Sequence, residues 1–214
     1  MSLGAALLGL SILAGIVASI RPRRELVVVH AGTAIAAVAV LVAAFATEDW
    51  SYSYVVSATR PGLGLLVRIA GLWGGAEGSL LLFVGFVAIA ALIVEKMGGE
   101  SRPLTALASA YAVVTLISAN PFEQLDARAV GGLGLQPVLE HPAMAWHPPI
   151  LYLGLVGVMI PGLLAVGGAG DRQIRAATRV SLAFLTAGLA TGAAWAHAEL
   201  GWGGYWAWDP IESA

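Results

Sequence analysis

Long runs of apolar residues, separated by short groups of charged ones, dominate this chain. A helix needs about 20 consecutive apolar residues to cross the hydrocarbon core of a bilayer. Six runs approach or reach this length, and each lacks Asp, Glu, Lys and Arg. The pattern predicts an all-α polytopic membrane protein with about six transmembrane helices in a single membrane domain over residues 1–214. The predicted spans lie near Leu3–Ile20, Leu26–Ala46, Gly78–Val94, Pro103–Ala119, Ile150–Gly170 and Val180–Ala196.

Composition supports a membrane protein and excludes some kinds of chemistry. Hydrophobic residues make up 58% of the 214 residues and charged residues only 11%, which is under half of the roughly 25% charged residues typical of soluble domains. Cysteine is absent, so the chain has no thiol of its own for redox or thioether chemistry. The net charge of -2 gives no reason to expect a nucleic-acid partner.

Basic residues are divided unevenly between the segments that separate the apolar runs. With the amino terminus outside, the inner loops hold eight of the eleven Lys and Arg residues and the outer loops hold three. Cytoplasmic loops are the ones enriched in Lys and Arg. The count therefore predicts a multi-pass protein of the cytoplasmic (inner) membrane with its amino terminus outside. The functional loops, near residues 47–77, 120–149 and 199–214, are expected on the outer face.

The densest aromatic segment is Trp202–Pro210, with the sequence Trp-Gly-Gly-Tyr-Trp-Ala-Trp-Asp-Pro. Tryptophan and tyrosine often form belts at membrane surfaces, and an isolated cluster of this kind is typical of such a belt. The paired glycines Gly203 and Gly204 indicate something more, because positions without side chains let a flat object such as a porphyrin approach the backbone. The neighbouring motifs favour this second interpretation.

A histidine stands just before the fifth apolar run, in the sequence Trp146-His147-Pro148-Pro149. Each proline locks φ and removes a backbone donor, so the imidazole is expected to be held by a stiff connection at the outer membrane surface. A neutral imidazole there is a good axial ligand for haem iron. A helix-entry histidine hydrogen-bonded to headgroups or to a carbonyl fits this segment equally well.

The other histidines are expected to be structural. His141 is interpreted as a loop residue and His30 as a packed residue near the inner end of the second run. His197 is interpreted as an interfacial histidine that is able to tune or replace an iron ligand.

A second tryptophan and glycine motif, Trp73-Gly74-Gly75-Ala76-Glu77-Gly78-Ser79, precedes the third run. Glu77 or Ser79 is expected to satisfy amides of the first helical turn. That role leaves the Trp-Gly-Gly segment unexplained. This segment lies on the same predicted membrane face as Trp202–Pro210.

Taken in order, these motifs resemble the CcmF family of cytochrome c-type biogenesis proteins, a branch of the tryptophan-rich WWD haem-handling (cytochrome c assembly) proteins. The motif order and the Glu77–Leu82 stretch favour CcmF or its nitrite-reductase-assembly paralogue over the related CcmC and CcsA families. The sequence departs from the family pattern at Ala76, Tyr205 and Glu212-Ser213. The matching segments are Trp73–Leu82, Asn120-Pro121-Phe122, His147–Gly157 and Trp195–Glu212.

The resemblance implies a haem lyase component without a general acid or base in this chain. His147 would be an axial ligand of the iron of a transiently bound haem, expected to be haem b. The partners implied are a haem chaperone, apocytochrome c and its thiol-presenting assembly subunits. The other haem-contacting residues implied by the resemblance are Trp202, Gly203, Gly204, Tyr205, Trp206, Trp208 and Asp209.

The family continues through many more spans, so the chain is expected to be a fragment or one half of a split protein. It would then act only with the carboxy-terminal half, carried on a separate chain if the protein is split. Two alternatives remain open at this point. A haem transporter or exporter subunit would use the same platform, although no charged residue marks a polar route through the spans. A structural membrane subunit would need the aromatic residues only as a belt among the lipids.

Overall fold

The computed structural model describes residues 2–21 and 23–199, and these residues fold into helices joined by loops. The described part contains no strand, and an isolated antiparallel bridge joins Tyr52 to Gln124. The prediction of an all-α fold is confirmed. The elements are α1 (Leu3–Ile20), α2 (Arg24–Ala46), α3 (Ser53–Ala58), α4 (Leu65–Ala70), η1 (Gly71–Trp73), α5 (Ala76–Lys96), α6 (Arg102–Ser118), η2 (Pro137–Glu140), η3 (Pro142–Ala145), α7 (His147–Gly157), α8 (Met159–Val166) and α9 (Asp171–Glu199).

Five helical segments of the described residues are long and apolar enough to cross a membrane. They are α1, α2, α5, the segment Pro142–Val166 that contains α7 and α8, and α9. The remaining predicted span corresponds to α6, an apolar helix of 17 residues that is shorter than the others. All six predicted runs therefore coincide with apolar helices, and five of them have the full length.

The fifth predicted run is not one continuous helix. α7 ends at Gly157 and α8 begins at Met159, with Val158 between them. Pro161 lies in the first turn of α8 and has no backbone N–H, so it cannot donate to the carbonyl of Gly157 four residues earlier. A proline at this place commonly bends or breaks a membrane helix.

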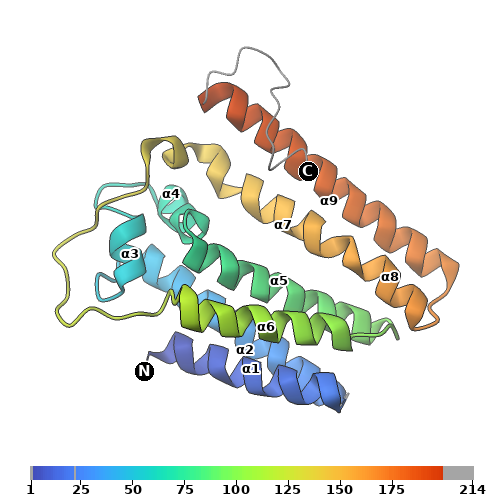
Figure 1. The fold of residues 1–214 in the computed structure, drawn as a ribbon. Helices are drawn as coiled ribbons and strands as arrows, with labels where there is room; N and C mark the ends of the chain where they lie inside the picture. The colour runs from blue at the N-terminus through green and yellow to red at the C-terminus, as the bar shows by residue number, and fades with distance from the viewer. Residues whose placement is uncertain (1, 22, 200–214) are drawn as a thin grey trace.

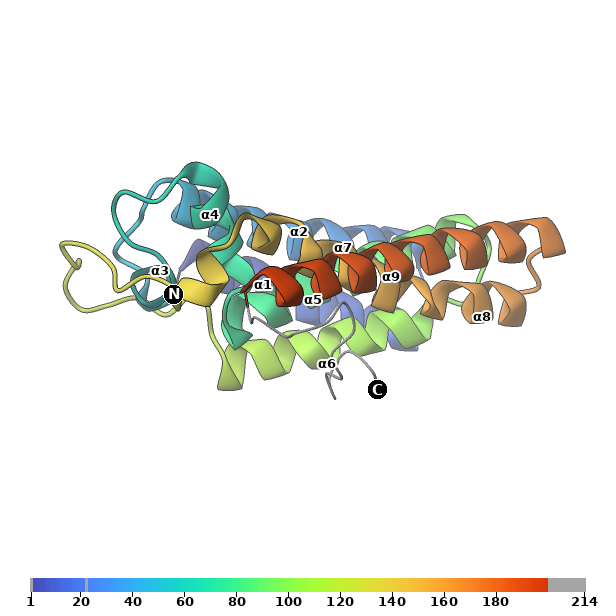
Figure 2. The same cartoon turned by 90° about the horizontal axis from the view of Figure 1, so that it is seen from above.

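The connections gather at two ends of the molecule (Figure 1 and Figure 2). One end, which we call the loop end, holds the start of α1, residues 47–75, residues 119–146 and the last turn of α9. The other end, the turn end, holds the end of α1, the start of α2 and the shorter connections at 97–101 and 167–170. This division separates the segments that the sequence assigned to the outer face from those assigned to the inner face.

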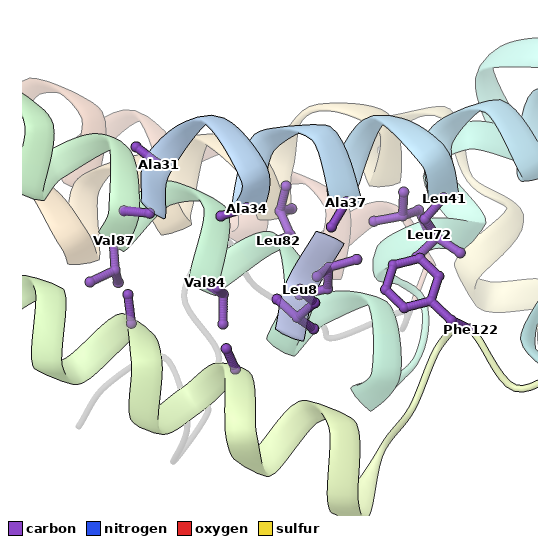
Figure 3. Packing of buried hydrophobic residues seen from close by; sticks show 14 of the residues in the cluster. Leu8, Ala31, Ala34, Ala37, Leu41, Leu72, Leu82, Val84, Val87 and Phe122 are labelled. Carbon is purple, nitrogen blue, oxygen red and sulfur yellow. The ribbon is translucent and has the colours of Figure 1, made fainter. Parts of the chain in front are cut away.

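The core lies between α1, α2, α5 and α6, and small side chains bring these helices together. On α2 the residues Ala31, Ala34 and Ala37 are fully buried, and Figure 3 shows them on the side of α2 that faces Leu8 of α1 and Val84 of α5. Alanine at successive turns allows the backbones of neighbouring membrane helices to approach closely. The hairpin of α7, α8 and α9 packs beside α5, and α9 is farthest from α1 (Figure 1).

Candidate functional site

The loop end contains a compact platform, made of residues 47–75 and 119–146, which we call the loop platform. Tyr54 organises one side of it, since its buried hydroxyl donates to the carbonyl of Leu72 at 2.8 Å and accepts the N–H of Gly75 at 3.0 Å. Burial raises the pKa of the Tyr54 hydroxyl, so this group stays protonated and remains a donor at neutral pH. The Tyr54 hydroxyl thereby fixes the backbone of the Trp-Gly-Gly motif.

Capping of α5 differs from the prediction. Glu77 lies in the first turn of α5, whose N-cap is Gly75, but neither Glu77 nor Ser79 hydrogen-bonds an amide of that turn. The hydroxyl of Ser79 instead donates to the carbonyl of Trp73 at 3.0 Å. The expectation that one of them satisfies a first-turn amide was wrong. The Ser79 hydroxyl is bonded to a carbonyl, and the amide just before the first turn, the N–H of Gly75, is satisfied by Tyr54, which is distant in the sequence.

One glycine of this motif, Gly78, is required by packing. A Cβ at position 78 would lie 1.6 Å from the carbonyl oxygen of Leu72, far inside van der Waals contact. The start of α5 therefore packs directly against the backbone of η1. The glycine is needed at this position for packing within the protein itself.

The motif that contains Trp73 and the motif that contains His147 lie together in the structure. The indole N–H of Trp73 donates to the carbonyl of Met144, in the 3-10 turn η3 immediately before α7. The loop 120–140 is held on the same platform by a bidentate ion pair, in which Arg60 donates to Glu140 at 2.8 and 3.1 Å. These contacts hold the chain on the amino-terminal side of His147.

His147 is the first residue of α7, and its side chain is only 7% exposed. His147 stands at the loop end, and the structure buries its imidazole against α9. Its Nδ1 lies 2.9 Å from the carbonyl oxygen of Gly188. A carbonyl only accepts, so Nδ1 carries the hydrogen in this bond and Nε2 carries the lone pair of the neutral ring. This tautomer presents Nε2 as the nitrogen that is able to bind a metal.

An aromatic ring lies beside this imidazole. The ring of Trp195, on α9, is nearly parallel to that of His147, with an angle of 13° and 6.4 Å between centroids. The hydrogen bond and the aromatic contact both come from one helix, α9, and from residues 41 and 48 positions later in the chain. Gly188 could not be identified as a contact of His147 from the sequence, because no local pattern links two positions so far apart.

The other histidines lie in different surroundings. His141 accepts the N–H of Ala143 through Nδ1 at 3.1 Å, and its Nε2 lies 3.6 Å from a carboxylate oxygen of Glu199. This contact joins the loop platform to the last turn of α9. His197 is exposed in that same turn. His30 is fully buried between α1 and α2, where its Nδ1 lies 2.9 Å from the carbonyl of Ser11.

The aromatic segment at the end of the chain lies outside the described residues. This applies to all seven residues that the sequence assigned to a haem-contacting surface beside His147. They remain predictions from the sequence, and of the predicted site residues the structure places His147. The residues of this group are Trp202, Gly203, Gly204, Tyr205, Trp206, Trp208 and Asp209.

Similar proteins agree on one biological process. The cytochrome c-type biogenesis protein ccl1 of Rhodobacter capsulatus is 36% identical over 195 residues, which make up 83% of this chain and 30% of that protein. CycK of Rhizobium meliloti is 39% identical over 193 residues, or 82% and 29% of the two chains. CcmF of Escherichia coli K12 is 36% identical over 198 residues, or 82% and 30%. The chain thus spans about 30% of the length of the curated relatives it matches.

The fold is also found among solved structures. A structure named Cytochrome c Heme Lyase CcmF superposes with a TM-score of 0.72 at 28% identity, and the match covers 99% of this chain and 37% of that one. The resemblance predicted from the motifs is therefore confirmed, and the chain is a multi-pass membrane protein. The family described as Cytochrome C assembly protein matches residues 73–214. That range takes in Trp73, His147 and most of the chain, which therefore belongs to the cytochrome c assembly protein family.

Proposed function

We propose that this protein is a haem-binding membrane component of cytochrome c maturation. In this proposal it receives haem, of the b type, from a haem chaperone and holds it while the haem is attached to apocytochrome c. The observation that carries the proposal is the orientation of His147, a buried histidine whose Nδ1 is bonded to the Gly188 carbonyl at 2.9 Å. A histidine that binds a metal through one ring nitrogen commonly donates the N–H of the other to a backbone carbonyl or a carboxylate.

The donor set of the described residues suits a haem better than a bare metal ion. Among residues 2–21 and 23–199, no three His, Cys, Asp or Glu side chains lie close enough together to hold a metal ion. Haem iron takes only one or two axial ligands from the protein. The proposal gives His147 the role of one axial ligand. It gives Trp202–Asp209 the role of the haem-contacting surface, with Gly203 and Gly204 allowing close approach.

The chemistry of attachment belongs to the haem and to the apocytochrome. Haem supplies vinyl groups, and a cysteine thiol adds across each of them, so that a carbon–sulfur bond forms and the thiol hydrogen is transferred to the other vinyl carbon. This chain contains no cysteine, so both thiols come from the apocytochrome and are presented by its assembly subunits. The part of this chain is to bind and orient the substrate.

The direct test is the visible spectrum of the full-length protein, meaning this chain together with the expected carboxy-terminal half, purified from the membrane of haem-replete cells. We expect a haem absorption band, and we expect the protein to support covalent cytochrome c formation in a strain that lacks its own haem lyase. A protein without a haem band would point to a structural subunit. Bound haem without covalent cytochrome c formation would point to a transporter.

The same proposal places the loop end outside the cytoplasmic membrane, with residues 1–214 as one membrane domain. Cysteine substitutions in this cysteine-free chain test the orientation. In Val130→Cys, at a fully exposed position of the loop end, the thiol should react with an impermeant reagent in intact cells. In Gly170→Cys, at an open position of the turn end, the thiol should react only after the membrane is permeabilised. The reverse labelling pattern would show that the orientation is wrong.

A further inference from the structure

Helices α7 and α9 run antiparallel along a seam at which their backbones touch. A Cβ added to Gly154 of α7 would lie 2.5 Å from the backbone nitrogen of Leu185, and a Cβ added to Gly188 of α9 would lie 2.7 Å from Cα of Leu151. Neither distance is compatible with a side chain. Glycine on both helices is therefore what allows this approach.

This close approach lets a side chain of α7 reach a main-chain atom of α9. The carbonyl of Gly188 accepts two hydrogen bonds from side chains, one from His147 Nδ1 at 2.9 Å and one from the hydroxyl of Thr191 at 3.0 Å. Gly192, one turn farther along α9, is also buried. Trp195 follows on the same face and lies nearly parallel to the imidazole, at 13°.

We propose that Gly188 and Trp195 are positioning residues that set the direction of His147 Nε2, an inference that rests on the haem-binding function proposed above. The Gly188 carbonyl fixes which nitrogen carries the hydrogen. A single hydrogen bond leaves the ring free to turn about that contact, and the indole of Trp195 restricts this turning. Loss of a residue that hydrogen-bonds and orients a metal ligand typically costs about 10- to 100-fold in affinity for the metal.

The positioning also has a consequence for the rest of the site. α9 ends at Glu199, and Trp202 follows three residues later in the sequence. The helix that orients the iron ligand is therefore the helix that leads into the predicted haem-contacting segment.

Chemical rescue tests the Gly188 contact without altering the seam. In the full-length protein, His147→Gly removes the ligand and leaves room for an added imidazole. Imidazole and 4-methylimidazole each have an N–H that can donate to the Gly188 carbonyl, whereas 1-methylimidazole has none. We expect the first two compounds to restore the haem spectrum at concentrations about tenfold lower than 1-methylimidazole, the effect of one hydrogen bond.

Equal potency of the three compounds would overturn the role of Gly188. Failure of all three would also count against it, provided that the unsubstituted protein binds haem through His147, because a preformed acceptor should capture the free ligand. If the unsubstituted protein shows no haem band that depends on His147, the proposed function fails first. The two failures are therefore distinguishable.

A matched pair of substitutions tests Trp195. Trp195→Phe keeps a flat ring beside His147, whereas Trp195→Leu keeps apolar bulk without a ring plane. We expect the haem affinity of Trp195→Phe to stay near that of the unsubstituted protein, and that of Trp195→Leu to fall by about tenfold with an altered absorption band. Equal affinity and an equal spectrum for the two variants would show that Trp195 only fills space.

Discussion

Replacement of His147 by asparagine is expected to remove haem from the full-length protein while leaving the fold intact. The asparagine amide can still donate to the Gly188 carbonyl, which the Nδ1 of His147 contacts at 2.9 Å, but it cannot bind iron. Because the ligand itself is lost, haem occupancy should fall by more than the roughly 10- to 100-fold that follows the loss of a residue hydrogen-bonded to a ligand. The measurement is the haem absorbance per protein after purification, together with the yield of covalent cytochrome c.

Two further variants complete this experiment. His147→Ala removes both the iron ligand and the hydrogen-bond donor, so it should lose haem equally and also lower the melting temperature. His197→Ala changes an exposed histidine of α9 and should retain haem. If His147→Asn matures cytochrome c at the unsubstituted rate with normal protein levels, His147 is a packing residue and the ligand assignment is wrong.

Gly78→Ala is expected to have the largest effect on stability among single-methyl additions. The new Cβ would lie 1.6 Å from the carbonyl oxygen of Leu72 and 2.9 Å from the ring of Tyr54. The nearest atom belongs to the backbone and cannot move aside as a flexible side chain would. We expect the free energy of unfolding to fall by about 3 kcal/mol, the upper part of the usual range for overpacking.

Thermal unfolding of the purified protein in detergent measures this effect, with Gly162→Ala as the control. Gly162 lies in the first turn of α8 and has no atom within 4 Å of an added Cβ. Alanine is the better helix former by about 1 kcal/mol, so the control should be as stable as the unsubstituted protein or slightly more stable. Equal losses in the two variants would show that Gly78 is not held against η1.

Part of the candidate site could be recognised from local sequence. The stiff His147-Pro148-Pro149 connection marked the histidine, and the Trp-Gly-Gly of Trp73–Gly75 marked a second segment at the same end of the molecule. Both conclusions needed only residue types and their spacing. What local sequence could not predict was the burial of the imidazole or the role of Tyr54, whose hydroxyl satisfies the Gly75 amide at 3.0 Å. The hydrogen bond that satisfies an amide can come from any element packed against it.

The positions of the membrane helices could be predicted from the sequence, because crossing the bilayer demands long runs of apolar residues whatever the helices pack against. The order of the motifs also indicated the family. In contrast, the pairing of α9 with α7 and the contact between the Gly188 carbonyl and a histidine 41 residues earlier are visible only in the folded structure. Lipid is as apolar as leucine, so hydrophobicity does not specify which membrane helices associate. Which helices pair depends on close packing, and here the glycines of α7 and α9 each meet the backbone of the other helix.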